Sequence, residues 1–171
     1  MMHALQDLPK LRQMTSVPLT HGEEWGHRWD FNKLVENHDV DYIRATLPNV
    51  GGITEMMKIA AMCETHAVGI VPHFTGPIAT AALVNCLSTF SGPLMFEYNY
   101  GGRPIDYLPE CLDWRQGKAY TNQRPGLGVT LDRTALARLH DNYLNCGIRN
   151  RDDLGQMRKY DPSFTGVQPR Y

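Results

Sequence analysis

The chain has 171 residues, of which 42% are hydrophobic and 20% are charged, and its formal net charge is −1. These values are typical of a globular domain and argue against nucleic acid or an anionic membrane surface as a partner. No apolar run approaches the roughly 18 residues of a membrane span, and Asp7, Pro9 and Lys10 interrupt any signal-peptide core, so we expect a cytoplasmic protein.

The first hundred residues alternate between short apolar runs and amphipathic segments. Residues 3–14 are typical of the end of a helix. The pattern then predicts strands and helices in turn, at residues 17–20, 29–36, 40–45, 53–65, 68–71, 77–87 and 93–96. In helix 29–36 we expect four apolar members, Trp29, Phe31, Leu34 and Val35. Such alternation favours parallel strands joined by helical crossovers, an α/β fold.

The composition changes after Glu97. Residues 98–109 are rich in Gly, Pro and Tyr, and residues 117–132 suggest a hairpin with Gly126-Leu127-Gly128 in its returning part. A helix is predicted at residues 134–143 and a polar, irregular tail at 147–171. We therefore divide the chain into residues 1–97, which carry the strand and helix periods, and residues 98–171, the C-terminal segment.

Four cysteines, Cys63, Cys86, Cys111 and Cys146, lie 23 to 35 residues apart without a C-x-x-C pair. This spacing fits neither a zinc ribbon nor a disulfide framework and indicates reduced thiols. Cys63 and Cys86 fall in apolar helical patterns, so we expect them to pack in the core rather than act as nucleophiles.

Polar residues follow the predicted strands where each strand ends: Glu23, Thr46, His73 and Glu97. The carboxyl ends of parallel strands meet at one rim, where ligands collect, so we expect Glu23, His73 and Glu97 to share a cavity. Carboxylates there suit Mg²⁺, and a histidine nearby suits a general base acting on a carbon acid. A histidine in a surface loop, a solvated Glu23 and a salt-bridged Glu97 are the alternative interpretations.

Several motifs together resemble a known family. They are Thr15-Ser16-Val17-Pro18-Leu19-Thr20-His21-Gly22-Glu23, Arg28-Trp29-Asp30-Phe31, Val50-Gly51-Gly52-Ile53-Thr54-Glu55 with Lys58-Ile59-Ala60, Pro72-His73, Gly76-Pro77-Ile78-Ala79 and Gly126-Leu127-Gly128-Val129. Their order and gaps across residues 5–135 resemble the C-terminal half of the mandelate racemase and muconate lactonizing branch of the enolase superfamily. The most similar subgroup is the acid-sugar dehydratases similar to D-galactonate dehydratase.

The resemblance implies a (β/α)₈ barrel, of which this chain carries the C-terminal half, about strands 5–8, and a return segment toward a capping domain. It implies Glu23 as a ligand of Mg²⁺, His73 as the general acid and base, and Glu97 as the group that hydrogen-bonds the substrate carboxylate or enediolate. The family has an Asp beside that His, where this chain has Thr46, which carries no charge. Two further metal carboxylates of the family have no counterpart in the chain.

The function implied is a Mg²⁺-dependent lyase that dehydrates a small-molecule carboxylate, a sugar acid, by proton abstraction and an enediolate intermediate; racemisation and cycloisomerisation stay open. The alternative is a truncated, non-catalytic remnant or interaction module. Four parallel strands leave open edges at residues 17–20 and 93–96, so we expect a homo-oligomer or association with a missing N-terminal half.

Overall fold

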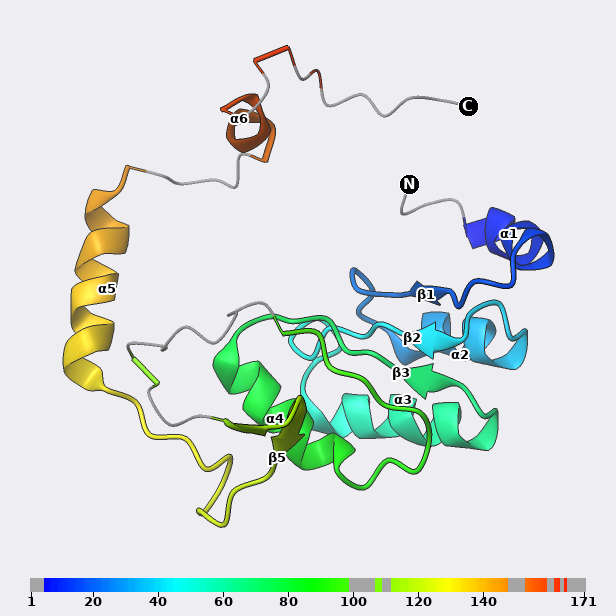
Figure 1. Ribbon diagram of the computed structural model, residues 1–171, viewed down its shortest axis with the longest axis horizontal. Coiled ribbons are helices and arrows are strands. Elements are labelled where there is room, and N and C mark those ends of the chain that lie inside the picture. The colour runs from blue at the N-terminus through cyan, green and yellow to red at the C-terminus, as the bar shows by residue number, and fades with distance from the viewer. Residues whose placement is uncertain are drawn as a thin grey trace. The chain divides into compact units, whose positions relative to one another are not determined.

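The computed structural model describes residues 5–98, 107–108, 112–147, 153–159, 162–163 and 165 (Figure 1). The chain divides into two compact units, Met1–Asp132 and Arg133–Tyr171. None of the helices in the described part of the chain is both long and apolar enough to cross a membrane.

Three short parallel strands lie at the centre of the first unit: β1 (Thr20–His21), β2 (Tyr42–Ile43) and β3 (Gly69–Ile70), in this order. The register pairs Thr20 with Tyr42 and Tyr42 with Gly69. The fourth predicted strand, at residues 93–96, is reduced to one parallel bridge between Ile70 and Leu94. The parallel order is confirmed, while the regular pairing is shorter than predicted.

A helix follows each of the three strands: α2 (Arg28–Glu36), α3 (Ile53–Thr65) and α4 (Pro77–Leu87). The bounds of α3 and α4 agree with the sequence prediction, and α2 begins one residue earlier. Gly76 precedes α4 with φ of 119°, a conformation that side chains disfavour. Pro77 then occupies the first helical position, where its missing N–H costs no intrahelical hydrogen bond. The Gly-Pro pair therefore sets the start of α4.

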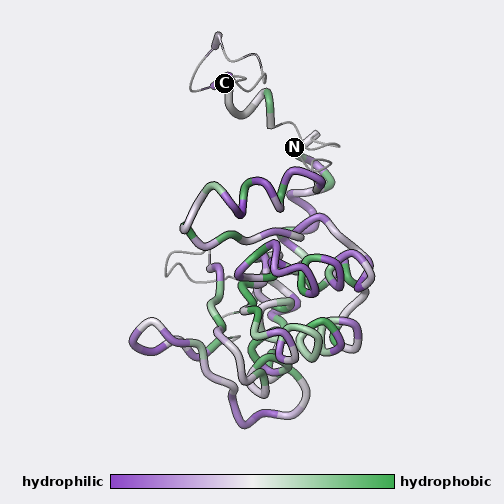
Figure 2. The backbone as a smooth tube through the Cα atoms, turned by 90° about the vertical axis from the view of Figure 1, so that its right-hand side faces the viewer, coloured by the Kyte–Doolittle hydropathy of each residue, from purple (hydrophilic) through white to green (hydrophobic). Residues whose placement is uncertain are grey.

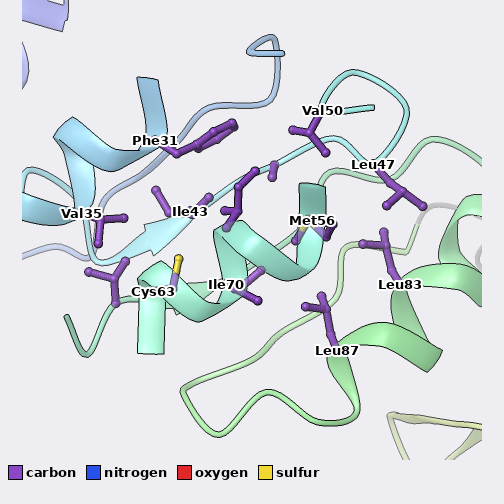
Figure 3. Packing of buried hydrophobic residues seen from close by; sticks show 14 of the residues in the cluster. Phe31, Val35, Ile43, Leu47, Val50, Met56, Cys63, Ile70, Leu83 and Leu87 are labelled. Atoms are coloured by element: carbon purple, nitrogen blue, oxygen red, sulfur yellow. The ribbon is translucent and has the colours of Figure 1, made fainter. Parts of the chain in front are cut away.

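One apolar core joins the strands to these helices (Figure 3). Its largest fully buried side chains include Phe31 from α2, Ile43 from β2, Met56 from α3, Ile70 from β3 and Leu83 from α4. The tube in Figure 2 shows apolar segments gathered where these elements meet. Because Ile43 and Ile70 hold the carboxyl ends of β2 and β3 in this core, the loops that follow these two strands begin from fixed positions.

Trp29 does not belong to this core. Its side chain is 67% exposed, and the Arg28 guanidinium lies 4.5 Å from the centre of its ring. Phe31, Leu34 and Val35 form the buried face of α2, and Trp29, the fourth apolar residue predicted for this helix, lies outside that face.

A short 3₁₀ turn, η1 (Leu5–Asp7), and helix α1 (Leu8–Met14) precede β1, as the helical pattern predicts. Pro9 lies in the first turn of α1, where proline is tolerated. Residues 3 and 4 of the predicted segment lie outside the described residues.

The hairpin lies earlier than the sequence suggested. Strands β4 (Asp113–Arg115) and β5 (Lys118–Tyr120) pair antiparallel, and Gln116 and Gly117 form the connection with positive φ angles of 52° and 73°. The prediction of a hairpin over residues 117–132 is therefore wrong, because Gly126-Leu127-Gly128 lies in a turn closed by the Gly128 N–H and the Pro125 carbonyl.

The second unit contains α5 (Arg133–Asn145) and α6 (Asp153–Arg158). Helix α5 confirms the helix predicted at residues 134–143 and extends it at both ends. Helix α6 lies within the tail that we predicted to be irregular, so that prediction is wrong for these six residues.

Cys63 and Cys86 occupy the environments expected of packing residues. Cys63 is buried and Cys86 half-buried, and burial raises the pKa of the Cys63 thiol to about 12. Cys146 is exposed, and Cys111 lies outside the described residues. A thiol with such a raised pKa carries almost no thiolate at neutral pH, so Cys63 is not a nucleophile.

Candidate functional site

The parallel pairing continues past the strands and aligns their carboxyl ends. The Arg44 N–H donates to the His21 carbonyl at 2.9 Å, and the His73 N–H donates to the Ala45 carbonyl at 3.0 Å. Arg44 thus lies beside the end of β1, and His73 beside the end of β2. Because these bonds connect neighbouring backbones, side chains from successive strand ends meet at one rim.

Glu23, His73 and Glu97 come together at this rim, as the sequence predicts. His73 Nδ1 lies 3.0 Å from Glu97 Oε2 and 3.6 Å from Glu23 Oε2. The side chains of His73 and Glu97 are 32% and 25% exposed, so the site is partly open to solvent. The roles assigned to the three residues remain predictions.

Arg44, which the sequence reasoning missed, lies between them. Its Nε donates to Glu23 Oε2 at 2.5 Å, its Nη2 donates to Glu97 Oε2 at 2.7 Å, and the same Nη2 lies 2.9 Å from His73 Nδ1. Burial alone would lower the pKa of Arg44, but the hydrogen bonds to the two carboxylates outweigh it and raise the pKa. The guanidinium is therefore a permanent positive charge at the centre of the site.

Glu97 is held by two donors at a single oxygen. Arg44 Nη2 donates to Oε2 at 2.7 Å and the Phe74 N–H donates to it at 2.9 Å, and His73 Nδ1 lies 3.0 Å from the same oxygen. Partial burial opposes ionisation of this carboxyl, but the Phe74 N–H and the Arg44 guanidinium together lower its pKa below the usual value. Glu97 is therefore a fixed carboxylate at neutral pH.

Thr46 is buried, with 3% of its surface exposed, and its side chain contacts the backbone of Glu23. Its hydroxyl donates to the Glu23 carbonyl, and Asn49 Nδ2 donates to the same oxygen at 3.0 Å. The single hydroxyl proton of Thr46 is thus directed to the backbone of Glu23 rather than to His73. Thr46 therefore fixes the loop after β1.

The turn that carries Glu23 depends on Gly22. This residue has φ of 118°, and a Cβ at this position would lie 2.5 Å from Cε1 of Phe31. The backbone can therefore pass over the Phe31 ring only without a side chain. A hydrogen bond of 3.1 Å from the Trp25 N–H to the Gly22 carbonyl closes the turn.

A small cavity of about 130 Å³ adjoins Glu23 and Arg44. Its lining consists of Thr20, His21, Gly22, Glu23, Glu24 and Arg44. Within the described residues, Nδ1 of His21 is buried without a hydrogen-bond partner. Burial lowers the pKa of His21, against the attraction of Glu23. His21 thus lies beside the site as a partly buried ring.

The described residues do not by themselves fit a Mg²⁺ ion. Magnesium takes six oxygen ligands in an octahedron. Here Oε2 of Glu23 and Oε2 of Glu97 already accept hydrogen bonds from Arg44, and no group of three acidic, histidine or cysteine ligands converges in the described part of the chain. A magnesium site would need oxygen ligands from outside these residues.

The family described as Enolase C-terminal domain-like matches residues 1–135. The chain is 34% identical to D-galactonate dehydratase of Xanthomonas axonopodis pv. citri (strain 306), over 78% of the chain and 37% of that protein. It is 35% identical to a D-mannonate dehydratase of Caulobacter sp. (strain K31), over 71% of the chain and 31% of that protein.

Solved structures give the same result. An enolase from Mycobacterium smegmatis complexed with formate and acetate has a TM-score of 0.81 and 29% identity, over 98% of this chain and 40% of that one. An enolase from Pantoea ananatis with bound D-gluconate and magnesium has a TM-score of 0.72 and 29% identity, over 81% of this chain and 34% of that one. The chain thus spans two fifths or less of the length of these relatives. The chain belongs to the enolase superfamily, in its C-terminal domain family, and its relatives named above include sugar-acid dehydratases.

Proposed function

We propose that the chain supplies the proton-transferring part of a sugar-acid dehydratase site. The observation that supports this most directly is the meeting of Glu23, His73 and Glu97 at one rim. The relatives named as D-galactonate and D-mannonate dehydratases, and the neighbour with bound D-gluconate, indicate a polyhydroxy acid as substrate. Its carboxylate is the small-molecule group that the site would recognise.

In the proposed reaction, His73 takes the proton from the carbon next to the substrate carboxylate. The electron pair left behind forms an enediolate, which expels the hydroxyl on the next carbon; that hydroxyl takes the proton that His73 now carries and leaves as water. The enol that remains becomes the 2-keto-3-deoxy acid. The enediolate carries more negative charge than the substrate, so it needs cationic donors nearby. Arg44 is the permanent cation of this rim.

We also propose the wider context of the site. The parallel sheet with its helices corresponds to about strands 5–8 of a (β/α)₈ barrel, and the structural match over 98% of this chain and 40% of a longer neighbour supports this. Mg²⁺ is the proposed cofactor of the complete site, because neighbours carry magnesium with D-gluconate or formate. Among the described residues, Glu23 is the ligand proposed for this metal, so no step is assigned to the metal here. Association with an N-terminal half, or with a second copy, would supply what is missing.

The test is a two-component dehydration assay. The chain is mixed with the part of a D-galactonate dehydratase that it does not match, and 2-keto acid formation is followed with D-galactonate, D-mannonate and D-gluconate. The corresponding segment of the dehydratase itself, added in trans, is the positive control. We expect turnover in the mixture, reduced at least about 100-fold by His73→Asn. Turnover unaffected by His73→Asn, or none while the positive control is active, would contradict the proposal.

A non-catalytic interaction module is the second candidate function. Two features favour it: Thr46 replaces the carboxylate that the family places beside the histidine, and Arg44 ties up an oxygen of each of the two carboxylates. This candidate predicts an inactive mixture in the same assay, together with a stable complex of the two components in ultracentrifugation.

A further inference from the structure

The family resemblance leaves His73 without an orienting acid, because Thr46 occupies that position. A histidine that moves protons works best when one ring nitrogen is held by a fixed acceptor, since this decides which nitrogen carries the proton. The Thr46 hydroxyl is uncharged and bonds the Glu23 carbonyl, whereas the groups at hydrogen-bond distance from Nδ1 of His73 in the described structure are Glu97 Oε2 and Arg44 Nη2. The structure offers another group.

We infer that Glu97 is the positioning residue of His73: its carboxylate holds the proton of the neutral ring on Nδ1. Nε2 is then left unprotonated as the atom that accepts a proton. The last step rests on the proposed function, whereas the location of the proton on the ring does not.

The distances support Glu97 as the acceptor. Glu97 Oε2 lies 3.0 Å from Nδ1, and Glu23 Oε2 lies 3.6 Å from the same atom. A lone pair on Nδ1 would face two negatively charged oxygens, which is unfavourable. A proton on Nδ1 would instead be attracted by both and form a charge-assisted hydrogen bond with the nearer one.

Arg44 Nη2, 2.9 Å from Nδ1, is the competing partner, because it could donate to an unprotonated Nδ1. However, the same Nη2 donates to Glu97 Oε2 at 2.7 Å, and Nε donates to Glu23 at 2.5 Å. The guanidinium thus has charged acceptors without Nδ1. Arg44 carries one positive charge, whereas Glu23 and Glu97 carry two negative charges, so these three side chains together are negative. This net charge also favours a proton on Nδ1.

Glu97 is suited to this role because it is itself held in place. The Phe74 N–H, which belongs to the residue directly after His73, donates to the oxygen that faces Nδ1. The backbone that positions His73 therefore also positions its acceptor. Arg44, whose side chain is 21% exposed, fixes the same oxygen from the β2 side.

The experiment reads the tautomer of His73 directly. The whole chain is labelled with ¹⁵N-histidine, and long-range ¹H–¹⁵N spectra are recorded at high pH so that neutral rings are observed. The His73→Asn variant identifies the signals among the seven histidines. We expect the neutral His73 ring to carry its proton on Nδ1. A neutral ring protonated on Nε2 would overturn the inference.

Two variants distinguish Glu97 from Thr46 as the controlling group. Glu97→Leu removes the acceptor, and we expect most of the Nδ1–H population to be lost. Thr46→Val keeps the shape at position 46, and we expect the wild-type tautomer. The reverse pattern would show that position 46 orients the ring.

A third variant tests the same role of Glu97 with a smaller change of shape, so that it is less prone to misfold than Glu97→Leu. Glu97→Gln keeps the size of the side chain while removing its charge, and we expect a partial loss of the Nδ1–H tautomer. An unchanged tautomer in a folded Glu97→Gln or Glu97→Leu variant would also overturn the inference. None of these readouts needs turnover, so this inference can fail while the dehydratase proposal stands, and the reverse.

Discussion

Replacement of Arg44 by methionine removes the guanidinium that joins Glu23 to Glu97 while keeping an apolar stem of similar length. Two charge-assisted hydrogen bonds are lost, at 2.5 Å to Glu23 and at 2.7 Å to Glu97. Both carboxylates then lie near one another without the cation. We therefore expect a lower free energy of unfolding at pH 7.

The size of the loss follows from the exposure of the partners. Glu97 is 25% exposed, so its hydrogen bond to Arg44 contributes about 1–2 kcal/mol, below the full value for charged groups because solvent still reaches the pair. Glu23 is 42% exposed, so its pair contributes about 0.5–1 kcal/mol. The sum is about 1.5–3 kcal/mol, which corresponds to a fall in Tm of roughly 5–15 °C for a unit of this size.

The loss should depend on pH in one direction. Glu97 has a pKa below its usual value in the folded protein. Its contribution is therefore complete above the unfolded pKa of about 4.3 and is lost as the pH falls through the folded pKa. Since Arg44 is part of the cause of that lowered pKa, the gap between wild type and Arg44→Met should narrow below about pH 4.

Urea and thermal unfolding followed by circular dichroism measure both effects. Arg115→Met is the matched control, because Arg115 and Asp113 form an ion pair at 3.1 Å with exposures of 63% and 43%. We expect the control to lose less than about 1 kcal/mol. The reasoning would be refuted by an Arg44→Met loss no larger than that of the control, or by a gap that widens as the pH falls.

Three further predictions use other parts of the chain. Asp41 accepts hydrogen bonds from the Leu19 N–H at 2.7 Å and from Arg12 at 2.6 and 2.8 Å, and these bonds lower its pKa. Asp41→Asn should therefore lower the free energy of unfolding in urea by about 1–2 kcal/mol at pH 7. The difference in stability between wild type and variant should disappear below about pH 3.9. An equal loss at all pH values would contradict this. Addition of Mg²⁺ or EDTA should change the Tm of the isolated chain by no more than about 1 °C. Micromolar Mg²⁺ binding in calorimetry would contradict this, because it would show a metal site that the described residues do not form. Iodoacetamide should modify exposed Cys146 and spare Cys63 in the native chain, as peptide mass spectrometry can show, and equal labelling would indicate that the core opens readily.

The helices that pack on the sheet could be predicted well, because their sequences contain both a period and a boundary. Helix α3 repeats apolar residues along one face and follows Gly51-Gly52, and helix α4 begins at Gly76-Pro77. The exposure of Trp29 could not be predicted, because a large apolar residue in the first turn of an amphipathic helix looks the same in sequence whether it is buried or exposed. The hairpin was placed too late because the glycines at 126 and 128 form a turn, whereas Gln116-Gly117 connects the strands.

The candidate site could be predicted in part. The rule that parallel strands end at one rim brought together Glu23, His73 and Glu97, and the structure places them within hydrogen-bond or ion-pair distance. Arg44 was missed because it lies inside the predicted strand 40–45, where only tertiary pairing shows which way a side chain goes. The signal in the sequence was Arg44 itself, because a charged residue at the end of an apolar run indicates a side chain at the end of a strand.

The central proposal is that this rim takes part in binding a sugar acid. Titration of the ¹⁵N-labelled chain with D-galactonate or D-gluconate tests it most directly, because backbone amides report the location of binding without any need for turnover. We predict that the largest shift changes occur at residues 22–24, 44–46, 73–74 and 97, and that Arg44→Met weakens binding. Largest changes at the separate cavity of about 310 Å³ that is lined by Gln6, Pro9, Trp25, Asp30, Lys33, Leu34, Asn37 and Asp39, or no change at millimolar ligand, would contradict it.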